Sequence, residues 1–190
     1  MNMPSYIILG LFPFLGLGTS PTATAQGPSR DIETSKFTYR EVVQVDSVAD
    51  STLFQRAKSW YEHEFKTAEL DLKNSVDGTL VHKGSFPVTW SNGKSFTQEM
   101  QVGYTVTLNT RTNKYRYSIT DFMVTRNTGR VVETVTLETF CDQGIPQLAG
   151  SGKFFEPVKK DVLGQIDAYI TARIESMRGI CSGKIEKDDW

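Results

Sequence analysis

The sequence predicts an α+β protein in which two helices cover one face of a single antiparallel-rich sheet. Apolar residues recur at spacings of three and four within residues 51–67 and 156–178, which is typical of amphipathic helices. Five other stretches alternate apolar and polar residues, as half-buried strands do. The predicted order is β-α-β-β-β-β-α, and the short links between the four middle strands favour an antiparallel meander. Each amphipathic helix needs an apolar surface to cover, so both are expected on one face, with the other face open to water.

Composition places the chain among ordinary globular proteins. Its 190 residues include 21 basic and 22 acidic ones, for a formal net charge of −1, and 38% are hydrophobic. These values exclude a wholly disordered, collagen-like or coiled-coil chain. The near-neutral balance also disfavours a nucleic-acid-binding protein, which needs a clustered positive surface.

The N-terminal segment predicts export to the periplasm or the outside of the cell. Residues 1–25 carry no charged side chain, and the apolar run Tyr6–Leu17 is shorter than the ~20 residues of a membrane-spanning helix. Ala23 and Ala25 supply the small residues of a signal-peptide cleavage site, so cleavage is expected after Ala25. The segment departs from the usual signal-peptide pattern in one respect, because no Lys or Arg precedes the apolar run. The alternative to a cleaved signal peptide is an uncleaved N-terminal anchor. After cleavage we expect no stable membrane insertion.

The remaining chain divides into three parts. Residues 26–35 are expected to form a flexible leader, residues 36–180 a folded domain, and residues 181–190 a charged tail. The first strand covers residues 36–45, and Glu41 interrupts its apolar side. The first helix follows, with Asp50-Ser51-Thr52 as candidate N-caps.

The middle strands fix which residues face the helices. A strand over residues 78–89 carries Gly84 as a possible bulge. The hairpin loop Thr110–Asn113 and the turn Asn127–Gly129 bound the following strands, and the fifth strand is expected over residues 130–139. The side chains expected beneath the helices are Met100, Val102, Tyr104, Val106, Leu108, Tyr115, Tyr117, Ile119 and Met123.

Three segments resemble a known family. Leu53–Trp60 resembles the first-helix pattern Leu-aromatic-x-x-Ala-x-x-Trp of a secreted family of unknown function that is common in Bacteroidota. Gly78–Gly84 is similar to its second strand, and Lys114–Phe122 to its strand that ends in Thr-Asn/Asp-Phe. The resemblance, over about residues 36–178, implies a TATA-binding-protein-like (TBP-like) two-layer sandwich and an exported location. It implies no activity, and a shared fold does not transfer DNA binding.

No catalytic, cofactor or metal site is predicted. His63 and His82 are the only histidines, and with Cys141 and Cys181 they lack zinc-site spacing. The two cysteines are expected at opposite ends of the second helix, too far apart to pair. The segment Gly150–Lys153 lacks the spacing of a phosphate-binding loop.

The expected function is therefore binding. The open face of the sheet is the candidate binding surface, for an unknown protein or small ligand in the cell envelope and not for nucleic acid. The alternatives are a structural protein of the cell envelope and an enzyme without a recognisable motif. The residues predicted to form the binding face are Arg40, Gln101, Thr105, Arg116 and Thr120.

Overall fold

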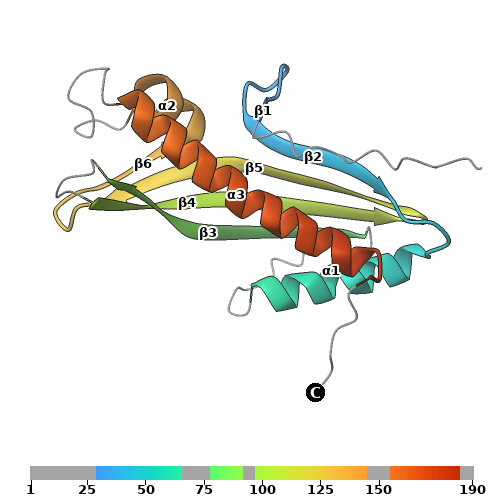
Figure 1. Cartoon of the computed structure of the whole chain (residues 1–190). Helices are drawn as coiled ribbons and strands as arrows, with labels where there is room; N and C mark the ends of the chain where they lie inside the picture. The colour runs from blue at the N-terminus through green and yellow to red at the C-terminus, as the bar shows by residue number, and fades with distance from the viewer. Residues whose placement is uncertain (1–28, 66–77, 92–96, 145–154, 185–190) are drawn as a thin grey trace, which may run out of the picture.

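The computed structural model describes residues 29–65, 78–91, 97–144 and 155–184 (Figure 1). It confirms the α+β prediction and adds a short strand and a short helix to the expected order. The elements are β1 (Ser29–Arg30), β2 (Phe37–Gln44), α1 (Asp50–Glu64), β3 (Thr79–Ser91), β4 (Thr97–Arg111), β5 (Lys114–Asn127), β6 (Val132–Thr136), α2 (Leu137–Gln143) and α3 (Phe155–Cys181).

All the strand pairs are antiparallel, and β5 lies at the centre of the sheet. The strand order is β1-β2-β5-β4-β3, and β6 also pairs with β5. The first half of β5 pairs with β2, whereas its second half pairs with β6, so these two strands share one side of β5. The predicted meander of β3, β4, β5 and β6 is confirmed.

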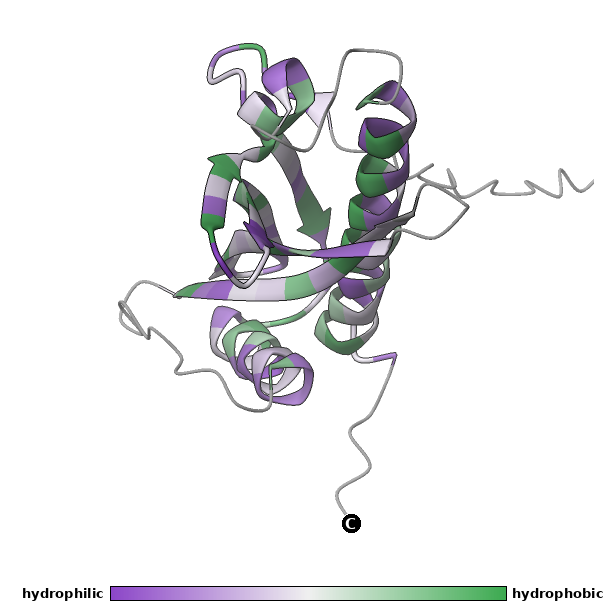
Figure 2. Ribbon diagram, turned by 90° about the vertical axis from the view of Figure 1, so that its left-hand side faces the viewer, coloured by the Kyte–Doolittle hydropathy of each residue, from purple (hydrophilic) through white to green (hydrophobic). Residues whose placement is uncertain are grey.

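The helices lie on one face of the sheet, which we call the inner face. Helix α3 runs diagonally across it, and α1 packs beside the C-terminal half of α3 (Figure 1). Figure 2 shows both long helices banded in hydrophobic and hydrophilic colours, as expected of helices with one buried side. Beneath the helices the predicted strand phase is confirmed, because Tyr104, Val106, Tyr117 and Ile119 are all buried.

A bulge in β5 changes this phase halfway along the strand. Thr105 pairs with Thr120 but Gly103 pairs with Met123, so two residues of β5 oppose Tyr104. The backbone accommodates the extra residue of β5 at Asp121, which has a positive φ of 56°. Beyond the bulge Phe122 is buried and Met123 is 36% exposed, so the prediction that Met123 points toward the helices is wrong.

The bulge predicted at Gly84 is absent, because the pairing of β3 with β4 is continuous from Thr79 to Ser91. Gly84 instead makes room for an aromatic ring directly across the strand pair. A Cβ atom at Gly84 would lie 2.6 Å from the ring of Tyr104. Glycine is therefore required here by a close approach and not by a bend.

Several predicted boundaries are also corrected. The fifth strand ends at Thr136, whose side chain accepts the backbone N–H of Thr139 and caps α2; the sequence predicted strand up to residue 139. The N-cap of α1 is Ala49, which has no side-chain cap, so the expected capping by Asp50, Ser51 or Thr52 is wrong. Helix α1 ends at Glu64, and α3 continues to Cys181.

The described part of the predicted leader is attached to the sheet. Strand β1 pairs with the start of β2, and the side chain of Asp31 accepts the backbone N–H groups of Glu33 and Thr34. The predicted signal peptide, the first residues of the leader and residues 185–190 of the tail lie outside the described residues. None of the described helices is long and apolar enough to cross a membrane.

Candidate functional site

The face of the sheet opposite the helices, the open face, is built from rows of side chains on β2, β5, β4 and β3. Strand pairing aligns these rows, and most positions carry threonine, serine or another polar residue. Most of the face is therefore polar, and its charged residues include more cations than anions. Three successive rows are Val42–Arg116–Asn109–Thr79, Arg40–Ser118–Thr107–Val81, and Thr120–Thr105–Lys83.

One end of the open face holds a hollow of about 400 Å³, which we call the basic hollow. It lies where β4 and β5 meet in the hairpin, beside the start of β3 and the end of β2. Thr79 donates a hydrogen bond of 2.8 Å to Oδ1 of Asn109, which leaves the amide NH2 group of Asn109 as a further donor. The lining residues are Val42, Thr79, Asn109, Thr110, Arg111, Lys114, Tyr115 and Arg116.

The cations of this hollow are close together and unpaired. Arg111 and Lys114 are directly opposite each other on β4 and β5, and Arg116 follows Lys114 on the same side of β5. Within the described residues, none of the three forms an ion pair. Arg40, one row away, differs because its guanidinium lies 3.5 Å from the carboxylate of Asp31. Hydrogen bonds from Thr34 and Glu33 lower the pKa of that carboxyl.

A second hollow, of about 500 Å³, lies on the open face beyond the bulge. Its polar groups are partly engaged with one another, since the amide of Gln101 donates to Glu99 over 3.2 Å. We call it the polar hollow, and it is lined by Glu99, Gln101, Thr125, Asn127, Gly129 and Val132.

The five residues predicted to form the binding face all lie on the open face, but not in one cluster. Thr105 and Thr120 are opposite each other, and Arg40 and Arg116 occupy neighbouring rows of β2 and β5. Gln101 lies apart from them, in the polar hollow.

Sequence reasoning missed Arg111 and Lys114 as site residues. The sequence placed Arg111 in a four-residue hairpin loop. In the structure Arg111 ends β4 and only Thr112 and Asn113 form the turn. The sequence did contain a signal for a two-residue turn, namely the asparagine at position 113. Asparagine tolerates the positive φ that tight hairpin turns require, and Asn113 adopts φ 64° in the structure. A two-residue turn at this position pairs Arg111 with Lys114.

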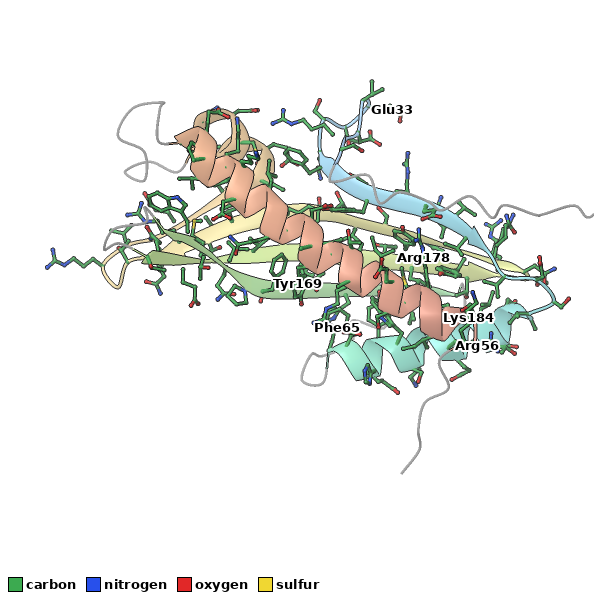
Figure 3. All side chains as sticks on the ribbon, in the orientation of Figure 1. Glu33, Arg56, Phe65, Tyr169, Arg178 and Lys184 are labelled. Atoms are coloured by element: carbon green, nitrogen blue, oxygen red, sulfur yellow. The ribbon has the colours of Figure 1, made fainter. Side chains whose placement is uncertain are left out.

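The inner face also carries charges, and these are paired. Glu41 accepts a hydrogen bond of 2.9 Å from the hydroxyl of Tyr117 and forms an ion pair with Arg178. Arg178, labelled in Figure 3, lies in the C-terminal part of α3. Burial and the neighbouring Glu41 raise the pKa of Tyr117. This contact explains why an acidic residue interrupts the apolar side of β2: it binds the C-terminal part of α3 to the sheet.

A second polar contact joins the two long helices. Glu64, near the end of α1, forms an ion pair with Arg173 and accepts a hydrogen bond of 2.6 Å from Ser176, both on α3. The side chain of Glu64 is only 8% exposed. Arg173 and Ser176 both contact the carboxylate of Glu64, so the cluster is suited to holding the two helices together.

The cysteines and histidines lie apart. Cys141 in α2 and Cys181 at the end of α3 are both buried and free. Burial raises the pKa of Cys141 to about 11 and that of Cys181 to about 12, so both are thiols at neutral pH.

His82 is buried on β3, its ring centroid 4.1 Å from that of Phe65, and burial lowers its pKa. His63 is exposed. Across the described ranges, no three His, Cys, Asp or Glu side chains are grouped so that they could hold a metal ion. Gly150–Lys153 lies outside the described residues.

Comparison with known proteins identifies the fold. Residues 39–125 match a family described as "Domain of unknown function (DUF4468) with TBP-like fold", as the sequence resemblance predicted. A solved TBP-like protein from Parabacteroides distasonis has a TM-score of 0.54 at 11% identity, over 80% of this chain and 98% of its own. A DUF4468 family protein from Bacteroides ovatus has a TM-score of 0.55 at 12% identity, over 75% of this chain and 86% of its own. No curated protein matches the chain.

Proposed function

We propose that this chain, whose residues 39–125 match the DUF4468 family with a TBP-like fold, is an exported, non-catalytic module that binds a protein or small ligand in the cell envelope. The observation that carries the proposal is the open face. Most of its side chains are polar, the described helices all pack on the opposite side of the sheet, and the described part of the face contains two hollows. A sheet of this size with one solvated face offers a preformed surface that needs little reorganisation to bind.

The state of the titratable groups favours binding over catalysis. The buried carboxylate of Glu64 and the half-buried carboxylate of Glu41 are held by arginines, and both thiols are strongly disfavoured as thiolates. Catalytic groups are instead expected within reach of a pocket, with pKa values moved toward neutrality. Neither of the two hollows is lined by a histidine or a cysteine.

Export is the part of the proposal that rests on the sequence alone. The uncharged apolar segment followed by Ala23-Thr24-Ala25 supports cleavage after Ala25. Mass spectrometry of the protein isolated from the cell envelope or the medium tests it. The expected mature chain begins at Gln26, and a chain that retains Met1 would contradict cleavage.

Site-specific photocrosslinking in living cells tests the binding surface. A photoreactive amino acid at Thr105, in the middle of the open face, is expected to crosslink one discrete partner. The matched control is the same amino acid at Glu62, which is exposed on α1. Crosslinking at both positions alike, or at neither, would contradict binding of a protein partner on the middle of the open face. A ladder of self-crosslinked chains at Thr105 would favour the structural alternative.

A further inference from the structure

The basic hollow contains more positive charge than the fold requires. Arg111, Lys114 and Arg116 are all exposed, and none is in an ion pair within the part of the chain that the structure describes. The other exposed charges at the same side of the sheet include Arg40, which does have a carboxylate partner. Lys83, in the middle of the face, also forms no ion pair within the described residues, but it lies opposite the uncharged Thr105. The grouping of three such cations is therefore local to the hairpin end of β4 and β5.

This arrangement opposes folding. Like charges directly opposite each other on neighbouring strands are destabilising, and Arg111 and Lys114 form such a pair. Arg116 lies two residues after Lys114, on the same face of β5, so its positive charge adds to the repulsion between Arg111 and Lys114. In the other described strand pairs of the open face, no two like charges are directly opposed: Thr105 faces Thr120, and Lys83 faces Thr105. A group of like charges that lowers the stability of the fold and lies in a concave part of the surface is typical of a ligand-binding site.

We propose that the basic hollow binds the phosphate group of a small ligand, with Arg111, Lys114 and Arg116 as its cationic contacts. This rests on the proposed function and names the ligand chemistry of one part of the open face. A phosphate carries up to two negative charges and presents several acceptor oxygens, which two guanidinium groups and one ammonium group satisfy well. The free amide NH2 group of Asn109 supplies a neutral donor at the same hollow.

One apolar residue of the hollow indicates what is attached to the phosphate. Val42 pairs with Arg116 and is 51% exposed, although its neighbours on the open face are polar. An aliphatic side chain beside three cations suits a ligand in which an aliphatic group carries the phosphate. Both a soluble phosphate ester and a phospholipid headgroup have this chemistry.

The distribution of charge favours a single phosphate over a nucleic acid. Binding along a nucleic-acid backbone requires a stripe of cations spaced with the phosphates. Here the only group of three cations among the described residues of the open face lies in one hollow. The middle of the face carries mainly uncharged side chains, such as Thr105 and Thr107, with Lys83 and Arg40 as single cations. The polar hollow at the other end contains Glu99, which would repel a continuing polyanion.

Titration of the isotope-labelled protein, as the cell processes it, tests the site by nuclear magnetic resonance. The probes are inorganic phosphate, glycerol 3-phosphate and vesicles of phosphatidylglycerol, with sodium chloride at matched ionic strength as the salt control. Backbone amides of Asn109 and Arg116 are expected to shift with the phosphate probes, while Gln101 in the polar hollow does not.

Variants identify the cations that bind. Lys114→Gln and Arg116→Gln are each expected to weaken binding of glycerol 3-phosphate about tenfold, the loss of one charge-assisted hydrogen bond. The matched control is Lys83→Gln, an exposed cation on the same face that does not line the hollow, and it is expected to leave binding unchanged. All three side chains are exposed, so the variants are expected to fold, and unchanged spectra of the buried residues check this.

The outcomes separate the possible sources of the phosphate. Binding of glycerol 3-phosphate assigns a soluble ester, and binding of the vesicles alone assigns a lipid headgroup. Equal shifts with chloride and phosphate, equal losses in Lys83→Gln and Lys114→Gln, or tighter binding of a DNA oligonucleotide than of either phosphate probe would each overturn the proposal. A negative result here leaves the crosslinking test at Thr105 independent, because that position lies outside the hollow.

Discussion

The inner face of the sheet and the basic hollow of the open face differ in whether their charged side chains have ion-pair partners among the described residues. On the inner face Glu41 is bound by Arg178 and Tyr117, and Glu64 between the helices is bound by Arg173 and Ser176. On the open face, the three cations of the basic hollow have no carboxylate partner among the described residues.

This difference follows from solvent exposure. A charge removed from water must be paired and hydrogen-bonded, whereas a charge that remains in water is tolerated alone. The fold therefore uses its inner charges for architecture and leaves the three cations of the basic hollow available for a ligand. Substitutions that separate the two roles test this comparison.

The largest effect is expected from Glu64→Ala. It removes a carboxylate that is 8% exposed and leaves Arg173, itself 31% exposed, without its ion-pair partner. We expect the free energy of unfolding to fall by about 3 kcal/mol, as measured by urea denaturation. The control is Glu62→Ala, because Glu62 on the same helix faces solvent and lies 3.9 Å from Lys58. That change is expected to cost less than about 0.5 kcal/mol, and equal losses would show that Glu64 is not architectural.

A glycine on each face gives the next contrast. Gly84→Ala would place a Cβ atom 2.6 Å from the Tyr104 ring on the inner face. Overpacking is expected to destabilise the protein by about 2 kcal/mol. Gly103→Ala on the open face meets its nearest atom at an ordinary 3.8 Å and is expected to be neutral or slightly stabilising. Thermal unfolding of the two variants distinguishes the faces, and a tolerated Gly84→Ala would contradict this account of the Gly84–Tyr104 contact.

A smaller effect concerns the free edge of the sheet. The side-chain amide of Gln165 on α3 accepts the N–H of Thr89, at 3.0 Å, and donates to its C=O, at 2.7 Å. It thus occupies backbone groups of the edge strand β3 that a further strand could otherwise pair with. Pro87, two residues earlier, has no N–H to offer at the same edge.

Gln165→Ala is expected to lower stability by about 1 kcal/mol and to increase self-association, measured by light scattering during mild heating. Gln165→Glu is the matched variant, because a carboxylate accepts the Thr89 N–H but cannot donate to the C=O. An unchanged association for both variants would show that Gln165 does not protect the edge.

The smallest effect has the opposite sign. Lys114→Thr removes one member of the like-charged pair with Arg111 and introduces a residue favoured in strands. In phosphate-free buffer of low ionic strength, we expect a gain of about 0.3 kcal/mol in the free energy of unfolding. A loss of stability would mean that Lys114 has a structural contact, contrary to the comparison of the two faces.

Much of the fold could be predicted because its signals are local. The alternation Met100–Leu108 and the spacing within α1 and α3 depend only on near neighbours in the chain, and both predicted which residues are buried. Helix α2 was missed because a helix of seven residues is too short to show a period, and its first residues continue the alternation of β6. Met123 was misplaced because the pattern is continuous across the bulge.

The bulge also gives a physical meaning to a motif of the resemblance. In Thr120-Asp121-Phe122, the middle residue has φ 56°, a left-handed conformation that asparagine and aspartate adopt more readily than most residues. The motif's Asn/Asp choice is therefore consistent with a backbone requirement. Its consequence, the burial of Phe122, becomes visible only when β4 is placed beside β5.

The amino-acid sequence alone was enough to predict the α+β class, the two long helices, the side of each strand that the helices cover before the bulge, and the resemblance to a TBP-like family. The contacts between distant residues became known from the folded chain: Glu41 with Arg178, Gln165 with the edge of β3, and the arrangement of Arg111, Lys114 and Arg116 in one hollow. Periodicity is a property of neighbouring residues, so one chain displays it. Strand register and helix placement depend on pairing between distant segments, which alternation alone does not specify.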